Sequence, residues 1–134
     1  GPKVMQVEKD YLEFLRLLNK HRVKYCIIGS YAVAFYGHPR YTKDIDILIE
    51  RSLSNARKLV KALIDFGFAS LKLKAEDFTE PGIIIQLGYE PLRIDIITSI
   101  KGTNFDRIWA NRQKGHYGDI KVNFIGLEGG RNGK

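Results

Sequence analysis

Apolar residues recur along this chain at two spacings. Intervals of three and four residues predict amphipathic helices, and short runs rich in β-branched residues predict strands. In chain order we expect a helix at about 7–21, a strand at 24–28, a helix at 30–37, a strand at 44–49, a helix at 54–66, a hairpin with strands at 83–88 and 93–98, a helix at about 104–113 and a last strand at about 119–125. This succession predicts an α/β fold with a mixed twisted β-sheet and helices packed on it.

Capping and turn residues mark several of the expected boundaries. Ser54 is expected to cap the helix that Gly67 ends, and Asn104 is expected to cap the helix after the hairpin. The segment 72–82 carries mixed charges and ends in Pro-Gly. We therefore expect it to form a loop with at most a short helical turn at 75–78.

The strand predicted at 44–49 begins with an Asp-x-Asp pair. Successive side chains of a strand point to opposite faces, so Asp44 and Asp46 share one face, while the isoleucines between and after them form the other. Two carboxylates this close repel each other unless a cation lies between them. With no Cys or His nearby in the sequence, oxygen ligands of this kind suit Mg²⁺ or Mn²⁺ better than zinc. The pair alone is also typical of a solvated strand end or a turn cap.

A glycine and a serine separate the first predicted strand from the next helix. Gly29 would let a phosphate approach the backbone without a Cβ in the way, and Ser30 offers a hydroxyl. The free amides at the start of the helix favour an anion. The alternative interpretation is that Ser30 merely caps this helix, which Gly37 closes.

A third carboxylate lies inside the second strand of the predicted hairpin. Asp95 interrupts an otherwise apolar, β-branched run, where a carboxylate is costly unless it has a partner. Arg93 lies two residues earlier and therefore on the same face. Judged alone, Asp95 is either one half of a salt bridge with Arg93 or a metal ligand.

In this order, the Gly-Ser turn, the Asp-x-Asp strand and the third Asp resemble the signature of the nucleotidyltransferase superfamily of DNA polymerase β. The stretches 29–34, 38–46, 86–88 and 93–98 are more narrowly similar to the small prokaryotic stand-alone members, some of which are toxins of toxin–antitoxin pairs. The resemblance covers roughly residues 7 to 127. It implies the nucleotidyltransferase fold.

The resemblance also implies an enzyme that transfers a nucleoside monophosphate from an NTP to an acceptor hydroxyl and releases pyrophosphate. Asp44 and Asp46 would hold two Mg²⁺ or Mn²⁺ ions, and Asp95 would bind the second ion and could accept a proton. The sequence leaves the acceptor open between tRNA or another RNA, a protein hydroxyl, a small molecule and another nucleotide.

Four further residues are expected to contact the nucleotide. Gly29, Ser30 and the amides at the helix start would hold the β and γ phosphates. Arg40 or Lys43, just before the acidic strand, would neutralise charge that develops during transfer. The alternative for these two basic residues is that they are solvated loop charges.

Composition predicts one domain over residues 1–134, with 44% hydrophobic and 28% charged residues. We expect Gly1-Pro2 to be a remnant of protease cleavage and the Gly-rich segment 126–134 to be a flexible tail. No apolar run approaches the roughly 18 residues of a membrane span, and Cys26 is expected to be a buried apolar residue. A cytoplasmic protein without a membrane partner is the expectation.

The formal net charge of +7 raises the question of nucleic-acid binding. Several basic residues lie on the helix predicted at 54–66, where a solvated helix face is the simpler interpretation. A basic surface would also suit an RNA acceptor. The competing functions are a non-catalytic module on the same fold that binds RNA or a protein partner, such as an antitoxin, and a two-metal phosphodiesterase.

Overall fold

The computed structural model describes residues 7–37, 44–89 and 91–127. Helices and strands alternate along most of the chain, as the hydrophobic pattern predicts. In order they are α1 (Lys9–Lys20), β1 (Tyr25–Ile28), α2 (Gly29–Phe35), β2 (Asp44–Ile49), α3 (Leu53–Leu63), the short irregular helical segments η1 (Ile64–Phe68), η2 (Ala69–Leu71) and η3 (Ala75–Phe78), β3 (Ile84–Tyr89), β4 (Leu92–Ile97), α4 (Phe105–Ala110), β5 (Gln113–Tyr117) and β6 (Ile120–Phe124).

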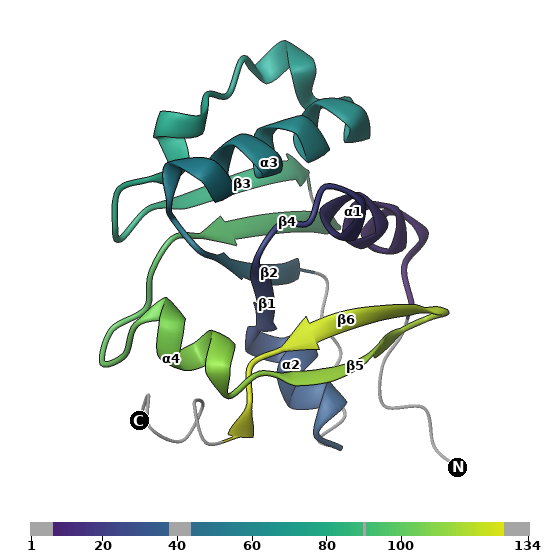
Figure 1. The fold of residues 1–134 in the computed structure, drawn as a ribbon. Helices are drawn as coiled ribbons and strands as arrows, with labels where there is room; N and C mark the ends of the chain where they lie inside the picture. Colours follow the sequence, from purple (N-terminus) through teal and green to yellow (C-terminus); the bar gives the residue numbers. More distant parts are fainter. Residues whose placement is uncertain (1–6, 38–43, 90, 128–134) are drawn as a thin grey trace.

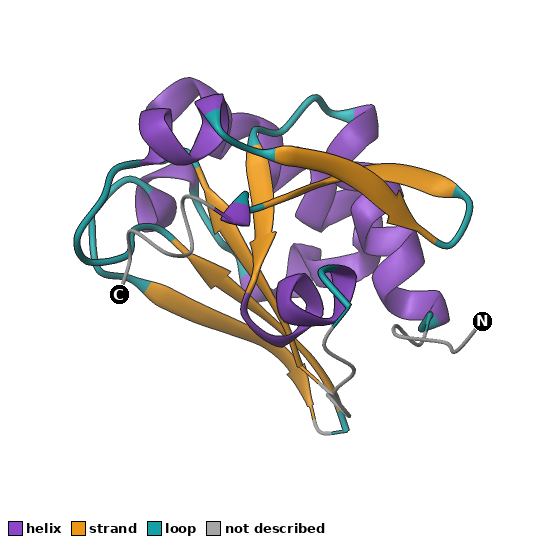
Figure 2. Ribbon diagram, turned by 90° about the horizontal axis from the view of Figure 1, so that it is seen from below, coloured by secondary structure: helices purple, strands orange, loops and turns teal. Residues whose placement is uncertain are grey.

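Within the described residues, the strands form one six-stranded mixed sheet in the order β3-β4-β2-β1-β6-β5. β2 and β4 are parallel neighbours, as are β1 and β6, and the other neighbouring pairs are antiparallel. Figure 2 shows the twist of this sheet, in which the β5–β6 hairpin crosses the direction of β3 and β4. The predicted α/β class and mixed twisted sheet are thus confirmed, and β2 and β4 are neighbouring interior strands of the sheet.

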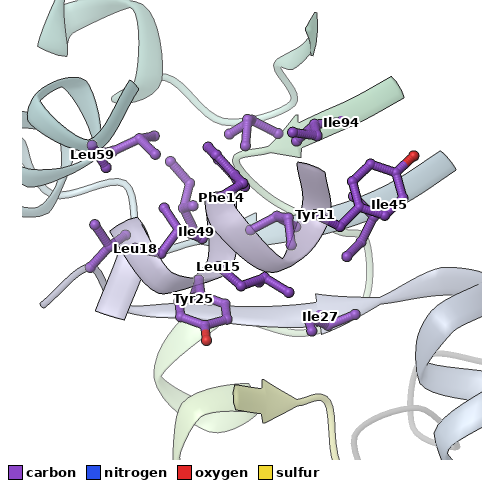
Figure 3. Packing of buried hydrophobic residues seen from close by; sticks show 14 of the residues in the cluster. Tyr11, Phe14, Leu15, Leu18, Tyr25, Ile27, Ile45, Ile49, Leu59 and Ile94 are labelled. Atoms are coloured by element: carbon purple, nitrogen blue, oxygen red, sulfur yellow. The ribbon is translucent and has the colours of Figure 1, made fainter. Parts of the chain in front are cut away.

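One face of the sheet is covered by α1 and α3 and contains the main hydrophobic core. Figure 3 shows Phe14 and Leu15 of α1 packed among side chains of the central strands. Ile45, Ile47 and Ile49 of β2 are completely buried on this face. Their burial fixes the orientation of β2, because a slip of one residue would turn them to the other face.

The opposite face is covered only in part, by α4 (Figure 1). A small cluster of Cys26, Leu48 and Ile108 is buried between this helix and the strands. Cys26 is therefore a buried apolar residue, as predicted, and burial raises the pKa of its thiol. Asp44 and Asp46 lie four and two residues before Leu48 on β2, so their side chains are on the same face of the sheet as this cluster. Asp95 lies beside Asp46 on the neighbouring strand β4 and is on this face too.

Several predicted boundaries need correction. The strand β5 was not predicted; only its first residue, Gln113, lies within the helix expected at 104–113, which instead ends at Ala110. Ser52 rather than Ser54 caps α3, since its hydroxyl accepts the Asn55 backbone N–H. The α-helix also ends at Leu63, before Gly67.

Other predictions of local structure are confirmed. The side chain of Asn104 accepts the Arg107 N–H at the start of α4. The helical turn expected at 75–78 is η3. No helix in the described ranges is long and apolar enough to cross a membrane. The segment 128–134, expected to be part of a flexible tail, lies outside the described residues, as does Gly1-Pro2.

Candidate active site

Three aspartates meet on the partly open face of the sheet. Asp44 and Asp46 are half-buried on the same side of β2, opposite its buried isoleucines. In the parallel pairing of β2 with β4, Asp46 is directly opposite Asp95, and Asp44 is directly opposite Arg93. The structure therefore brings together the three carboxylates that the sequence singled out.

Gly29 lies directly against one of these carboxylates. It follows β1, where Ile28 pairs with Asp46, and it has a φ of +70°. A Cβ added to Gly29 would overlap Oδ2 of Asp46 and lie 3.2 Å from its Cγ. Glycine is required here both for the left-handed backbone and for the close approach of the carboxylate.

Ser30 does not cap the helix that begins here. It lies inside α2, the residue in the N-cap position is Ile28, and no side chain caps this helix end. The interpretation of Ser30 as a helix cap is therefore wrong, and its role at the site stays a prediction. The helix ends before Gly37, whose φ is +90°, as expected.

Arg93 joins two of the aspartates. Its Nη2 donates to Oδ2 of Asp44 at 2.9 Å, and its Nε donates to Oδ1 of Asp95 at 3.0 Å. A longer contact of 3.4 Å joins Nη2 to Oδ2 of Asp95. Of the two partners considered for Asp95, the structure thus contains the Arg93 salt bridge, and Asp95 is 7% exposed.

The electrostatic environment of Asp46 is unfavourable to its negative charge. Burial, followed by repulsion from Asp95 and Asp44, raises the pKa of Asp46 to about 6, and Arg93 lowers it only in part. With all carboxylates ionised, the three aspartates and Arg93 have a net formal charge of −2. Additional positive charge would therefore stabilise the ionised cluster.

These oxygen ligands fit a hard divalent cation such as Mg²⁺ or Mn²⁺ in their chemistry. As it stands, however, no group of three or more His, Cys, Asp or Glu side chains in the described part of the chain is arranged to hold a metal ion. Arg93 occupies oxygens of Asp44 and Asp95 that a metal would need. Arg40 and Lys43, expected to contact the nucleotide, lie outside the described residues.

Tyr11 is a residue near the site that the sequence did not reveal. Its hydroxyl donates to the carbonyl of Arg93 at 2.9 Å and accepts the Arg93 N–H at 3.0 Å. On the other side of Arg93, the residue that pairs with it on β3 is Gly88, which has a φ of +84°. Tyr11 lies 82 residues from Arg93 in sequence, so no local signal could have linked them.

The fold of this chain is that of a nucleotidyltransferase. A structure from Thermotoga maritima, described as a candidate nucleotidyltransferase, is similar to this fold with a TM-score of 0.63 and 16% sequence identity. The similarity covers 92% of this chain and 81% of the other. The comparison with curated proteins gives no match.

Residues 29–128 match the family described as the nucleotidyl transferase AbiEii toxin of type IV toxin–antitoxin systems. The match begins at Gly29 and includes all three aspartates. This chain belongs to the AbiEii nucleotidyltransferase family.

Proposed function

We propose that this protein transfers a nucleoside monophosphate from an NTP to an acceptor hydroxyl, with Mg²⁺ or Mn²⁺ and with release of pyrophosphate. The observation that carries the proposal is the register of β2 and β4, which sets Asp46 beside Asp95 with the Gly29 backbone against the Asp46 carboxylate. A binding module has no need of this arrangement, because the arrangement concentrates repelling charges on two interior strands of the sheet.

In the proposed reaction Asp44, Asp46 and Asp95 would hold the divalent ions. The ions would supply positive charge for the phosphates and lower the pKa of the acceptor hydroxyl. Asp95 would also be placed to accept the hydroxyl proton. Gly29 brings its backbone against the Asp46 carboxylate, and its amide and that of Ser30, at the start of α2, would contact the phosphates of a nucleotide bound to the ions.

The proposal extends to the molecules with which this protein interacts. Membership of a type IV toxin–antitoxin family supports an antitoxin as partner and a toxin role for the transfer. A tRNA or other RNA acceptor would meet an exposed basic surface on α3, formed by Arg57, Lys58 and Lys61. We place the reaction in the cytoplasm, where NTPs and RNA are available.

Nucleotide binding tests the proposal most directly. We expect at least one of the four NTPs to bind in the presence of Mg²⁺ and to lose binding when EDTA is added, measured by isothermal titration calorimetry. An NTP labelled in the α-phosphate should then transfer its label to the acceptor, with pyrophosphate as the other product. Release of inorganic phosphate or of free NMP instead would indicate hydrolysis. Failure of every NTP to bind the folded protein would favour the non-catalytic module.

The raised pKa of Asp46 predicts the pH dependence of metal binding. The metal must displace the proton of Asp46, so its affinity should be constant above about pH 7 and fall below about pH 6, approaching about tenfold per pH unit for one proton. An ordinary Asp, with a pKa of 3.8, would not lose affinity until a much lower pH. Titration of Mn²⁺ at pH 5, 6, 7 and 8 measures this, with circular dichroism as a check of folding. Equal affinity at pH 5 and pH 7 would contradict it.

A further inference from the structure

Arg93 occupies a position that a structural salt bridge alone does not require. A single contact with Asp95 would compensate that carboxylate, which lies on the same strand. Instead the guanidinium reaches across to β2 and binds Asp44 as well, so it lies between two of the three proposed metal ligands. An arginine and a metal ion cannot use the same carboxylate oxygens at the same time.

The backbone and the side chain of Arg93 are held in different ways. Its N–H and carbonyl are both hydrogen-bonded to the hydroxyl of Tyr11, which is 1% exposed. Its side chain is 27% exposed and lies on the partly open face of the sheet. The guanidinium can therefore leave the carboxylates by rotation of side-chain bonds while the strand stays in place.

The strand register also places Arg93 at the same end of the sheet as the proposed phosphate site. Asp44 begins β2 and lies opposite Arg93, while Gly29 directly follows the end of β1, the other neighbour of β2. These residues therefore lie at one end of three adjacent strands. A guanidinium binds phosphate oxygens in the same two-pronged manner as carboxylate oxygens.

We infer that Arg93 is an internal counter-cation that competes with the divalent metal for Asp44 and Asp95 and, once displaced, binds the triphosphate of the incoming NTP. This rests on the proposed function and adds a specific nucleotide-binding residue to it. Metal binding and phosphate binding are thereby linked, because the ion that occupies the carboxylates also releases the cation that receives the nucleotide.

The test compares Arg93→Gln with Arg16→Gln. Arg16 also forms an ion pair, with Asp119 at 3.0 Å, but its side chain is 52% exposed and it lies on α1, so its loss changes the net charge equally without touching the acidic cluster. Calorimetric titration with Mn²⁺ alone should give a dissociation constant at least about fivefold lower for Arg93→Gln than for the wild type, and unchanged for Arg16→Gln.

The second measurement uses saturating Mn²⁺. Arg93→Gln should bind the preferred NTP at least about fivefold more weakly, and the corresponding NMP with unchanged affinity. If Arg93→Gln does not fold, Arg93→Lys serves instead: a point charge cannot bridge two carboxylates as the planar fork does, so the Mn²⁺ affinity should rise by a smaller factor.

The outcomes separate this inference from the proposed function. Equal or weaker Mn²⁺ binding by Arg93→Gln, with Mn²⁺ bound by the wild type, overturns the competition and means that Arg93 orients the carboxylates. Tighter Mn²⁺ binding with unchanged NTP affinity overturns the triphosphate role. Absence of Mn²⁺ binding in both proteins overturns the inference together with the metal-dependent function.

Discussion

Asp46→Asn is expected to abolish metal-dependent NTP binding and to reduce nucleotidyl transfer at least about a hundredfold, because a bound divalent ion supplies several kcal/mol of charge stabilisation. Asp46 lies between Asp95 on β4 and the end of β1, at the centre of the acidic cluster. Calorimetry with Mg²⁺ and NTP, and transfer of an α-labelled nucleotide, measure the two effects.

The same substitution should leave the metal-free protein folded and more stable at pH 7, by about 1–2 kcal/mol after allowance for solvent screening. A pKa raised to about 6 means that the folded wild type binds a proton more tightly than the unfolded chain. Its stability should therefore rise as the pH falls from about 6 towards 4, and this rise should be absent from Asp46→Asn.

Asp119→Asn is the matched control, because Asp119 is 70% exposed and pairs with Arg16. It should keep the binding of metal and nucleotide. Normal activity of the folded Asp46→Asn variant would remove the metal hypothesis.

Gly29→Ala should have the second large effect. The new Cβ would overlap the Asp46 carboxylate, and the φ of +70° is unfavourable for alanine by roughly 1–2 kcal/mol. Asp46 must then move away from its position beside Asp95, and we expect Mn²⁺ and NTP affinity to fall at least about tenfold. Calorimetry and thermal unfolding measure the two consequences.

Gly82→Ala separates the two causes. Gly82 has a φ of +74°, but a Cβ there would meet no other atom within 4 Å. It should lose a similar amount of stability from backbone strain and keep its affinity for metal and nucleotide. If both variants lose affinity equally, the contact between Gly29 and Asp46 has no part in the site.

The local parts of the candidate site were predictable from the sequence because they depend on short-range geometry. Alternation along a strand places Asp44 and Asp46 on one face, and the apolar residues between them decide which face that is. Gly29 at the end of a strand likewise predicts a tight turn, and the structure adds the contact that makes this glycine necessary.

The long-range parts were not predictable in this way. The sequence gives Arg93 and Asp95 as neighbours on a strand, but their register against β2, and so the bridge to Asp44, depends on the assembled sheet. Tyr11 was a typical apolar-face residue of a helix, and only the packing of α1 brings its hydroxyl to the Arg93 backbone.

The strand β5 was missed for a different reason. Among the described residues it is an edge strand that pairs only with β6, and Tyr117 is its only buried residue, so no alternation of apolar residues marks it. Glycine is required at position 115, because the ring of Phe35, which stacks on that of Phe124, fills the space that a Cβ would occupy.

The parallel pairing of β2 and β4 has a consequence for the time at which the site forms. These strands are neighbours in the sheet, but all of α3, the irregular segments after it and β3 separate them along the chain. Contacts across so long a connection form slowly, because the entropy of closing the loop is lost before the contacts are gained. During synthesis the first two aspartates leave the ribosome well before the third, and the three carboxylates of the proposed site come together only when β4 has docked.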